Sequence, residues 1–449
     1  MIGQRTLAAR RPFWRLQPED EWRRNLYALM VAVFVSFTGF TFVMPFLPLY
    51  IKELGVTDPG QAALWSGVLF GVSPLIAGVL APVWAIVGER YGRKAMMQRS
   101  LGAFVFLLAG MAFVTNVYQL LALRLLIGVF GGFGALSVAL ASGLAPRHRI
   151  GEAVGLIQAT QLGSGIAAPF LGGLVADTVG LKNSFFVASA LCLAGFVLIT
   201  ISYREERAES RGGATQRRQG GSLRAYLHLP IFIGLLVAIF TIQFIDRSFG
   251  PLLPLYIGTL GAPAERLGSI TGLVMTLGAL AGSVAAVWAG RLSSRRPPRP
   301  LLLVSLAAGA VLCLPIAFVG HWGQLLVLRT LLGLLAGGSL TLAYAVGGRQ
   351  LPPEAKVGAF GTLAGAGMIG GAISPLVTGV LSRYANLGTI FVVDTVLYLL
   401  VLAWSWTMLA QRAAPAPVPA TAHAGAAQTV LAERPSPPSA TDMRLSGKR

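Results

Sequence analysis

Two acidic residues lie inside long apolar stretches of the chain. Asp246 occurs in the sequence TIQFIDRSFGPLLPLY, and Asp394 lies in the apolar stretch 388–410. A carboxyl group away from water can take up and release a proton, or pair with a cationic substrate. Asp246 is the stronger candidate, because it lies about twelve residues, or ~18 Å, inside its stretch. The alternative is a structural ion pair of Asp246 with Arg247 or with a membrane arginine elsewhere.

Two arginines are also placed inside apolar stretches. Arg124 begins the sequence RLLIGVFGG, and Arg329 occupies the related position in RTLLGLLAG. If these stretches cross a membrane, a buried arginine is costly and is a candidate for a functional role. The alternative for both is a side chain that extends to the lipid headgroups.

Other chemistry has few residues to support it. The chain has no Walker A sequence, no Ser/His/Asp arrangement and no cluster of metal ligands, and Cys192 and Cys313 have no CxxC spacing. We therefore expect no enzyme activity, no metal and no cofactor. Gln158, Gln161 and Gln243 are candidates for lining a polar cavity.

The composition indicates a membrane protein. Of 449 residues, 55% are hydrophobic and 12% are charged, and the mean hydropathy is +0.69. Apolar stretches of the length that crosses a bilayer predict about twelve transmembrane helices. These stretches are 27–51, 63–87, 100–116, 118–144, 151–177, 183–203, 229–257, 267–290, 300–319, 323–348, 357–382 and 388–410.

Basic residues predict the orientation. The formal net charge is +19, and 29 of the 36 lysines and arginines fall on one side of the predicted helices. Cytoplasmic loops carry this excess, so both termini are predicted to be cytoplasmic in a multi-pass protein of the plasma (inner) membrane. Because the charges flank apolar spans, they indicate topology and contact with lipid headgroups, and they do not indicate nucleic-acid binding.

The chain divides into two related halves. PFLPLYIKELG at 45–55 matches PLLPLYIGTLG at 251–261, an offset of about 205 residues. Six helices return the chain to its starting side, so the repeats are parallel. The predicted parts are a cytoplasmic arm 1–26, a six-helix bundle 27–203, a linker 204–228, a second six-helix bundle 229–410 and a disordered tail 411–449.

The loop after the second span has a pattern suited to a gate. It reads GERYGRK, and its candidate latch residues are Glu89, Arg90, Gly92, Arg93 and Lys94. An acid facing arginines across a tight glycine turn can hold two bundles together and release them in another state. The alternative is that the basic residues act only as topological signals.

This loop resembles the hallmark motif G-x-x-x-D-R-x-G-R-K/R of the major facilitator superfamily, with Glu89 at the acidic position. The sequence at Arg124 is similar to the R-x-x-x-G-x-x-x-G motif of the family's fourth helix. The resemblance implies an all-α major facilitator fold of about twelve helices in two parallel repeats.

The fifth span resembles the G-x-x-x-G-P-x-x-G-G motif of the drug:proton antiporter branch. The relevant residues are Gly163, Ser164, Pro169, Gly172 and Gly173, with serine in place of one motif glycine. Small residues and a proline suit a closely packed, bendable helix between the halves. A helix that serves only packing is the alternative.

The resemblance implies a secondary transporter that exports amphipathic, drug-like molecules in exchange for protons by alternating access. We expect a monomer with a small-molecule substrate. An uptake symporter for a small metabolite is the second hypothesis. A membrane sensor or scaffold that transports nothing is the third.

Overall fold

Helices make up the regular structure in the described part of the chain. This computed structural model describes residues 18–202, 230–351 and 356–409, and these contain no β-strand. Most of the predicted arm, the whole predicted linker and the whole predicted tail lie outside the described residues.

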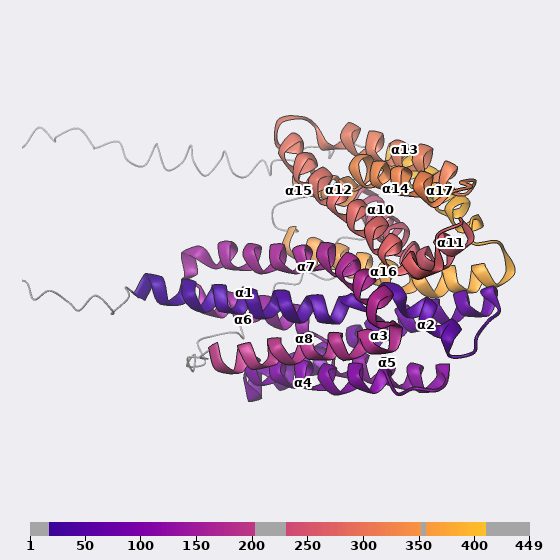
Figure 1. The fold of residues 1–449 in the computed structure, drawn as a ribbon. Helices are drawn as coiled ribbons and strands as arrows, with labels where there is room; N and C mark the ends of the chain where they lie inside the picture. The colour runs from indigo at the N-terminus through magenta and orange to yellow at the C-terminus, as the bar shows by residue number, and fades with distance from the viewer. Residues whose placement is uncertain (1–17, 203–229, 352–355, 410–449) are drawn as a thin grey trace, which may run out of the picture. The chain divides into compact units, whose positions relative to one another are not determined.

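The two halves contain the same succession of α-helices (Figure 1). The first half comprises α1 (Pro18–Phe42), η1 (Met44–Phe46), α2 (Leu47–Glu53), α3 (Pro59–Tyr91), α4 (Arg93–Met111), α5 (Val117–Phe130), α6 (Phe133–Leu144), η2 (Arg147–Arg149), α7 (Ile150–Val179) and α8 (Leu181–Ser202). The second comprises α10 (Pro230–Ser248), α11 (Leu253–Thr259), η4 (Ala264–Arg266), α12 (Leu267–Arg295), α13 (Pro298–Ile316), α14 (Trp322–Ala336), α15 (Ser339–Gln350), α16 (Lys356–Tyr384) and α17 (Thr389–Met408).

The predicted spans correspond to these helices. Among the described residues, 11 spans are long and apolar enough to cross a membrane. The helix α4 coincides with the remaining predicted span but does not meet that criterion, and its first turns carry Arg93, Lys94 and Arg99. The helix α1 begins at Pro18, before the predicted span. Proline suits the first position of a helix, because its missing N–H would have no partner there.

Four of the predicted continuous spans are broken, which the sequence analysis missed. The first span breaks at 43–46 and the seventh at 249–252, and the fourth and tenth break at Gly131–Gly132 and Gly337–Gly338. Gly132 has a φ of 102°, a backbone conformation that side chains other than glycine rarely adopt. Because the breaks recur at the same repeat offset, they belong to the architecture of both halves.

The same buried tyrosine hydrogen bond occurs in both halves and confirms the predicted internal repeat. The hydroxyl of Tyr50 donates to the carbonyl oxygen of Met111 at 2.8 Å, and the hydroxyl of Tyr256 donates to that of Ile316 at 2.7 Å. Both the tyrosines and their acceptors are separated by about 205 residues. The two halves therefore share one three-dimensional plan.

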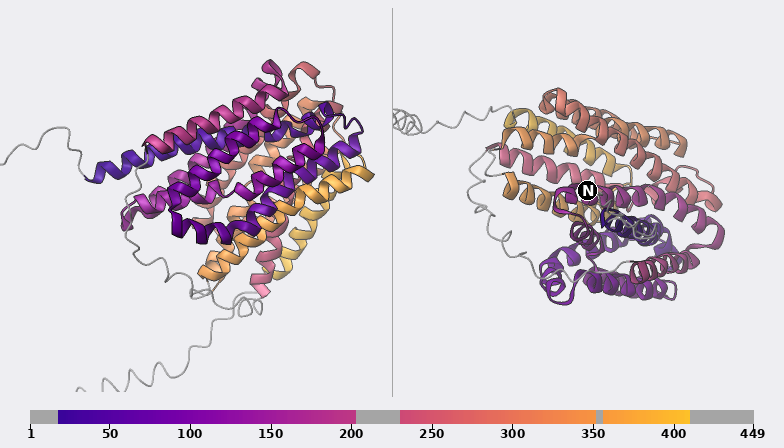
Figure 2. Two further views of the ribbon diagram at one scale, coloured as in Figure 1. Left: turned by 90° about the horizontal axis from the view of Figure 1, so that it is seen from below. Right: turned by 90° about the vertical axis from the view of Figure 1, so that its left-hand side faces the viewer.

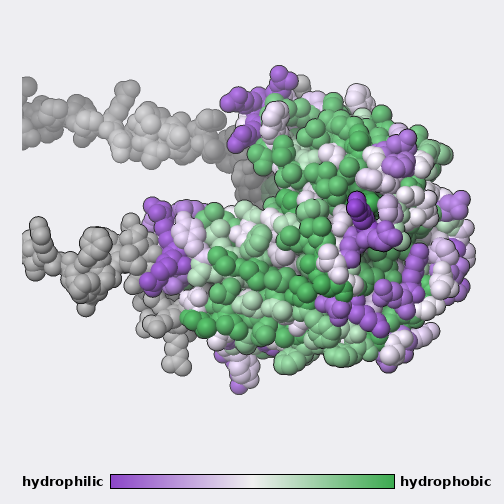
Figure 3. All heavy atoms as spheres, in the orientation of Figure 1, coloured by the Kyte–Doolittle hydropathy of each residue, from purple (hydrophilic) through white to green (hydrophobic). Residues whose placement is uncertain are grey.

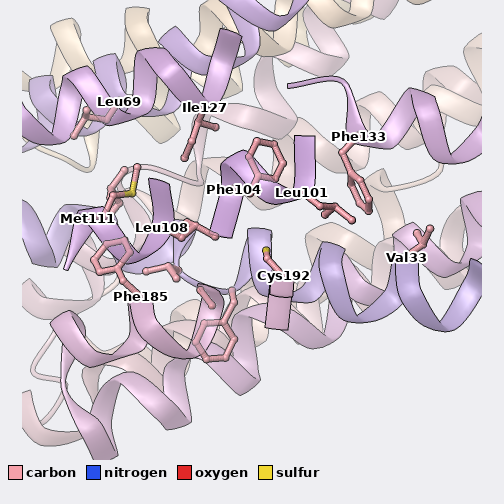
Figure 4. Packing of buried hydrophobic residues seen from close by; sticks show 14 of the residues in the cluster. Val33, Leu69, Leu101, Phe104, Leu108, Met111, Ile127, Phe133, Phe185 and Cys192 are labelled. Atoms are coloured by element: carbon pink, nitrogen blue, oxygen red, sulfur yellow. The ribbon is translucent and has the colours of Figure 1, made fainter. Parts of the chain in front are cut away.

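The structure has two hydrophobic cores, the first mainly in the first half and the second in the second half. Figure 4 shows part of the first core, where Leu101, Phe104 and Leu108 of α4 pack with Phe133 of α6 and Phe185 of α8. The second core is formed by residues of α10 to α17. The helices of each half run alongside one another, as two further views show (Figure 2).

Large apolar side chains also cover the outside of the bundle. Val79, Phe106, Trp288 and Phe318 are all more than 70% exposed. Hydrophobic residues dominate the sides of the helices in the view of Figure 3, whereas hydrophilic residues gather toward the helix ends. A surface of this kind is suited to contact with lipid tails.

Candidate functional site

The break between α10 and α11 brings together polar groups from distant parts of the second half. Ser248 ends α10, and its Oγ atom lies 2.5 Å from Oδ2 of Asp394 in α17. Asp394 is 0% exposed, and its Oδ1 atom has no hydrogen-bond partner among the residues that the structure describes. We call Ser248, Phe249, Arg329 and Asp394 the second-half junction.

Arg329 of α14 lies at the same junction. Its Cζ atom is 4.0 Å from the centroid of the Phe249 ring, so the guanidinium makes a cation–π contact with the broken segment. Arg329 forms no ion pair with Asp394 among the described residues. Within residues 18–202, 230–351 and 356–409, no ion pair neutralises the buried carboxyl of Asp394.

The equivalent arginine of the first half has different partners. Nε and Nη2 of Arg124 donate to the Leu69 carbonyl oxygen of α3 at 2.9 and 2.8 Å, and Nη1 lies 2.9 Å from Sδ of Met44. Arg124 is 3% exposed, so its side chain is held inside the bundle and does not reach lipid headgroups. At the position in the first half that corresponds to Asp394 stands Ala188.

Asp246 lies at the end of α10 in a more open setting. Its Oδ2 atom is 3.8 Å from Nε of Arg247, and both side chains are at least 60% exposed. Asp246 therefore forms the ion pair with Arg247 that the sequence offered as the alternative to a role in coupling. Asp394, by contrast, is buried.

The three predicted glutamines have different environments. Gln161 donates to Ser137 Oγ at 2.7 Å and to the Gly134 carbonyl oxygen at 3.0 Å, which joins α7 to α6. Gln158 is exposed on α7, and Gln243 is partly buried on α10.

The predicted latch loop joins α3 to α4. Gly92 lies between the two helices with a φ of 93°. Arg93 donates to the Ala139 carbonyl oxygen at 2.8 Å, and Lys94 donates to that of Thr200 at 3.2 Å. Arg90 is exposed, and the side chain of Glu89 lies outside what the structure describes. These hydrogen bonds hold α4 against α6 and α8 of the same half.

Arg99 of α4 contacts both the end region of α3 and the break between α5 and α6. Its Cζ atom lies 3.5 Å from the centroid of a Trp84 ring, and its Nη2 atom lies 3.4 Å from the carbonyl oxygens of Phe130 and Gly131. Arg99 thus holds the break between α5 and α6 against the end of α3. The glycine pair after Phe130 was the sequence signal for this break.

The helix with the predicted antiporter motif packs between α1 and α12. Ser164 Oγ donates to the Phe34 carbonyl oxygen of α1 at 3.1 Å. Gly172 leaves room for the Phe42 carbonyl, and Gly173 leaves room for the Gly268 backbone of α12. Gly163, by contrast, makes no such close approach, since a Cβ atom there would lie 3.9 Å from an atom of the Phe34 ring.

Two seams in which glycines allow close approach of the backbones join the halves. In one seam, a side chain at Gly272 of α12 would overlap the Pro169 carbonyl of α7. In the other, a side chain at Gly67 of α3 would overlap the Pro375 carbonyl of α16. Pro169 and Pro375 occupy equivalent positions in the repeat, so the seams are related by the same internal symmetry.

The contacts between the halves are concentrated toward one end of the helices. The hydrogen bonds that join the halves in the described part of the chain come from Asp177 and from Thr276, whose Oγ1 atom donates to the Ile166 carbonyl oxygen at 2.7 Å. Asp177 lies in the last turn of α7, at the end where α2 meets α3, which we call the closed end, whereas Ile166 lies near the middle of α7. The opposite end, which contains Ser202 at the end of α8 and Pro230 at the start of α10, is called the linker end.

This fold and its junctions define a class of polytopic membrane protein made of two six-helix repeats with broken helices and two inter-half seams. The family model of the Major Facilitator Superfamily matches residues 29–321 and also 235–440. The chain therefore belongs to the Major Facilitator Superfamily and is a membrane transporter.

Similar proteins include multidrug pumps. The chain is 32% identical over 385 residues to a protein named multi-drug resistance efflux pump PmrA homolog from Lactococcus lactis, covering 86% of this chain and 95% of that protein. It is also 32% identical over 405 residues to multidrug resistance protein MdtG from Salmonella paratyphi A, covering 88% and 99%. A solved bacterial homolog of the human lysosomal transporter Spinster, inward-facing and unoccupied, has a TM-score of 0.73 at 14% identity, covering 88% and 99%.

Ser248 and Asp177 take part in these contacts but were not predicted from the sequence. Ser248 stands two positions after the predicted Asp246, and Asp177 follows the predicted motif helix glycines. Neither residue type at its position has a distinctive spacing, so no sequence signal marked them.

Proposed function

We propose that this transporter exports amphipathic, drug-like molecules in exchange for protons, and that Asp394 carries the coupling proton. The relatives named as multidrug pumps support the substrate class. Proton coupling rests on one observation: a fully buried carboxyl group has one oxygen on Ser248 and the other without a partner.

The hydrogen bonds at Ser248 suit a protonated acid. Its hydroxyl lies 2.8 Å from the Ile245 carbonyl oxygen and 2.5 Å from Asp394 Oδ2, but a hydroxyl has one proton to donate. If Asp394 is protonated, it donates to Ser248, which in turn donates to Ile245. Release of this proton leaves a buried charge, which is costly, so the charged state favours a conformation with water or a cation at the carboxylate.

The orientation follows from the basic residues. The linker end carries most of the lysines and arginines, so we assign it to the cytoplasm and place both termini there. With the contacts between the halves at the closed end, the structure then corresponds to an inward-facing state. We also propose that the protein is a monomer and that it lies in the plasma (inner) membrane.

The test is transport by purified protein in liposomes with an imposed pH gradient. We expect a fluorescent amphipathic cation to move against the proton flux, and a protonophore to abolish that movement. Cotransport of a small hydrophilic metabolite with protons would overturn export in favour of uptake. Absence of any proton-dependent movement across a panel of both kinds of solute would overturn the transport proposal.

A further inference from the structure

The helix α12 obtains its N-terminal cap from the other half of the molecule. Its own N-cap residue, Arg266, makes no side-chain capping bond. Asp177 of α7 instead accepts hydrogen bonds from the backbone N–H of Gly268 at 2.9 Å and of Ser269 at 2.7 Å. Its Oδ2 atom also accepts from Ser269 Oγ at 2.5 Å. One carboxylate thus satisfies two of the free N–H groups at the start of α12.

The equivalent helix of the first half is capped differently. Asp58 is the N-cap of α3, and its Oδ2 atom accepts from the backbone N–H of Gln61 at 2.7 Å. That cap lies within one half and needs no second half. The repeat position of Asp177 in the other seam is occupied by Arg383, which cannot accept hydrogen bonds.

The cap across the seam depends on close approach of the two helices. A Cβ atom at Gly268 would lie 2.5 Å from Oδ1 of Asp177, so a larger residue there would displace the carboxylate. Any movement that separates α7 from α12 at the closed end breaks all three hydrogen bonds at once. It also removes a negative charge from the positive end of the α12 dipole.

We propose that Asp177 is a latch that stabilises the conformation closed at this end, and that it must release α12 in every transport cycle. This inference rests on the proposed alternating access, and it assigns to Asp177 a positioning role without contact to substrate. A cap shared between the halves gives stability to one conformation only, whereas the Asp58 cap stabilises both equally.

The test measures the distance between spin labels across the closed end. Cysteines replace Lys52 on α2 and Gly320 between α13 and α14, two exposed positions in different halves, in a background with Cys192→Ala and Cys313→Ala. Asp177→Ala is expected to lower the ratio of short to long distances by about tenfold, the size expected for loss of a charged helix cap. The matched control Asp58→Ala is expected to leave the ratio unchanged.

A milder variant protects the test against misfolding. Ser269→Ala removes one of the three donors and keeps both backbone N–H groups, so we expect a smaller shift in the same direction. Unchanged distances in both Asp177→Ala and Ser269→Ala would overturn the latch. An equal shift in Asp58→Ala would also overturn it, because the effect would then belong to any lost cap. These distances require no substrate or proton movement, so they test the latch separately from drug export.

Discussion

Ser248 Oγ and Asp394 Oδ2 lie 2.5 Å apart and connect the first and last helices of the second half. The contact occurs where α10 breaks, and broken helices in transporters lie where substrates and coupling ions bind. The first half has a break at the equivalent place but an alanine in place of the acid. The asymmetry between the halves therefore centres on Asp394.

Replacement of the two intramembrane acids distinguishes their roles. We expect Asp394→Asn to abolish transport driven by a pH gradient while substrate exchange without a gradient continues, because asparagine keeps the shape but cannot carry the proton. Asp246→Asn should retain coupling and change mainly the apparent affinity for cationic substrates, since Asp246 is exposed and already paired with Arg247. Vesicle assays with and without the gradient measure both. Normal coupling in Asp394→Asn would contradict the proposed proton carrier.

The two repeat-related arginines should differ in their response to lysine. Arg124→Lys loses the paired donation to the Leu69 carbonyl and should lower the free energy of unfolding by about 2 kcal/mol. Arg329→Lys exchanges one cation–π contact for a weaker one and should cost about 0.5–1 kcal/mol. Denaturant unfolding in detergent measures both free energies. Equal losses of stability in the two variants would show that the burial of Arg124 makes no additional contribution to stability.

The hydrogen bonds of Tyr50 and Tyr256 should contribute equally to the free energy of unfolding. Tyr50→Phe and Tyr256→Phe each remove one buried hydrogen bond, so each should destabilise the protein by about 1 kcal/mol. The double variant should show the sum, because the two sites lie in separate cores. Tyr384→Phe is the control, since Tyr384 is 79% exposed. Thermal melting of the four variants tests this, and an effect confined to one half would refute the equivalence.

Gly102 in α4 and Gly309 in α13 differ in how closely they are packed. A Cβ atom at Gly309 would lie 2.5 Å from the ring of Tyr398, whereas one at Gly102 would lie 3.8 Å from the ring of Phe196. Gly309→Ala should therefore lower stability by about 1–3 kcal/mol through overpacking. Gly102→Ala should be neutral or stabilising, because alanine favours a helix. The comparison is made by melting temperature, and a harmless Gly309→Ala would show that Tyr398 moves aside freely.

Much of the architecture could be read from the sequence. Hydropathy along the chain predicted the twelve helices, because the length of an apolar stretch must match the thickness of the bilayer. The match of PFLPLYIKELG with PLLPLYIGTLG predicted the repeat that Tyr50 and Tyr256 confirm. The helix breaks were not predicted. Glycine and proline can end the regular backbone hydrogen bonds of a span without lowering its mean hydropathy, so hydropathy alone does not reveal a break.

By itself, then, the sequence determined which segments enter the membrane and how the halves correspond, since both are properties of a one-dimensional pattern. Tertiary structure alone decided which acid is buried, because Asp394 and Asp246 lie in similarly apolar stretches but face different surroundings. It also decided that Asp177 caps α12, since that contact exists only when backbones of different halves approach closely at Gly268. Contacts between residues far apart in the chain depend on packing, which leaves no periodic signal in the sequence.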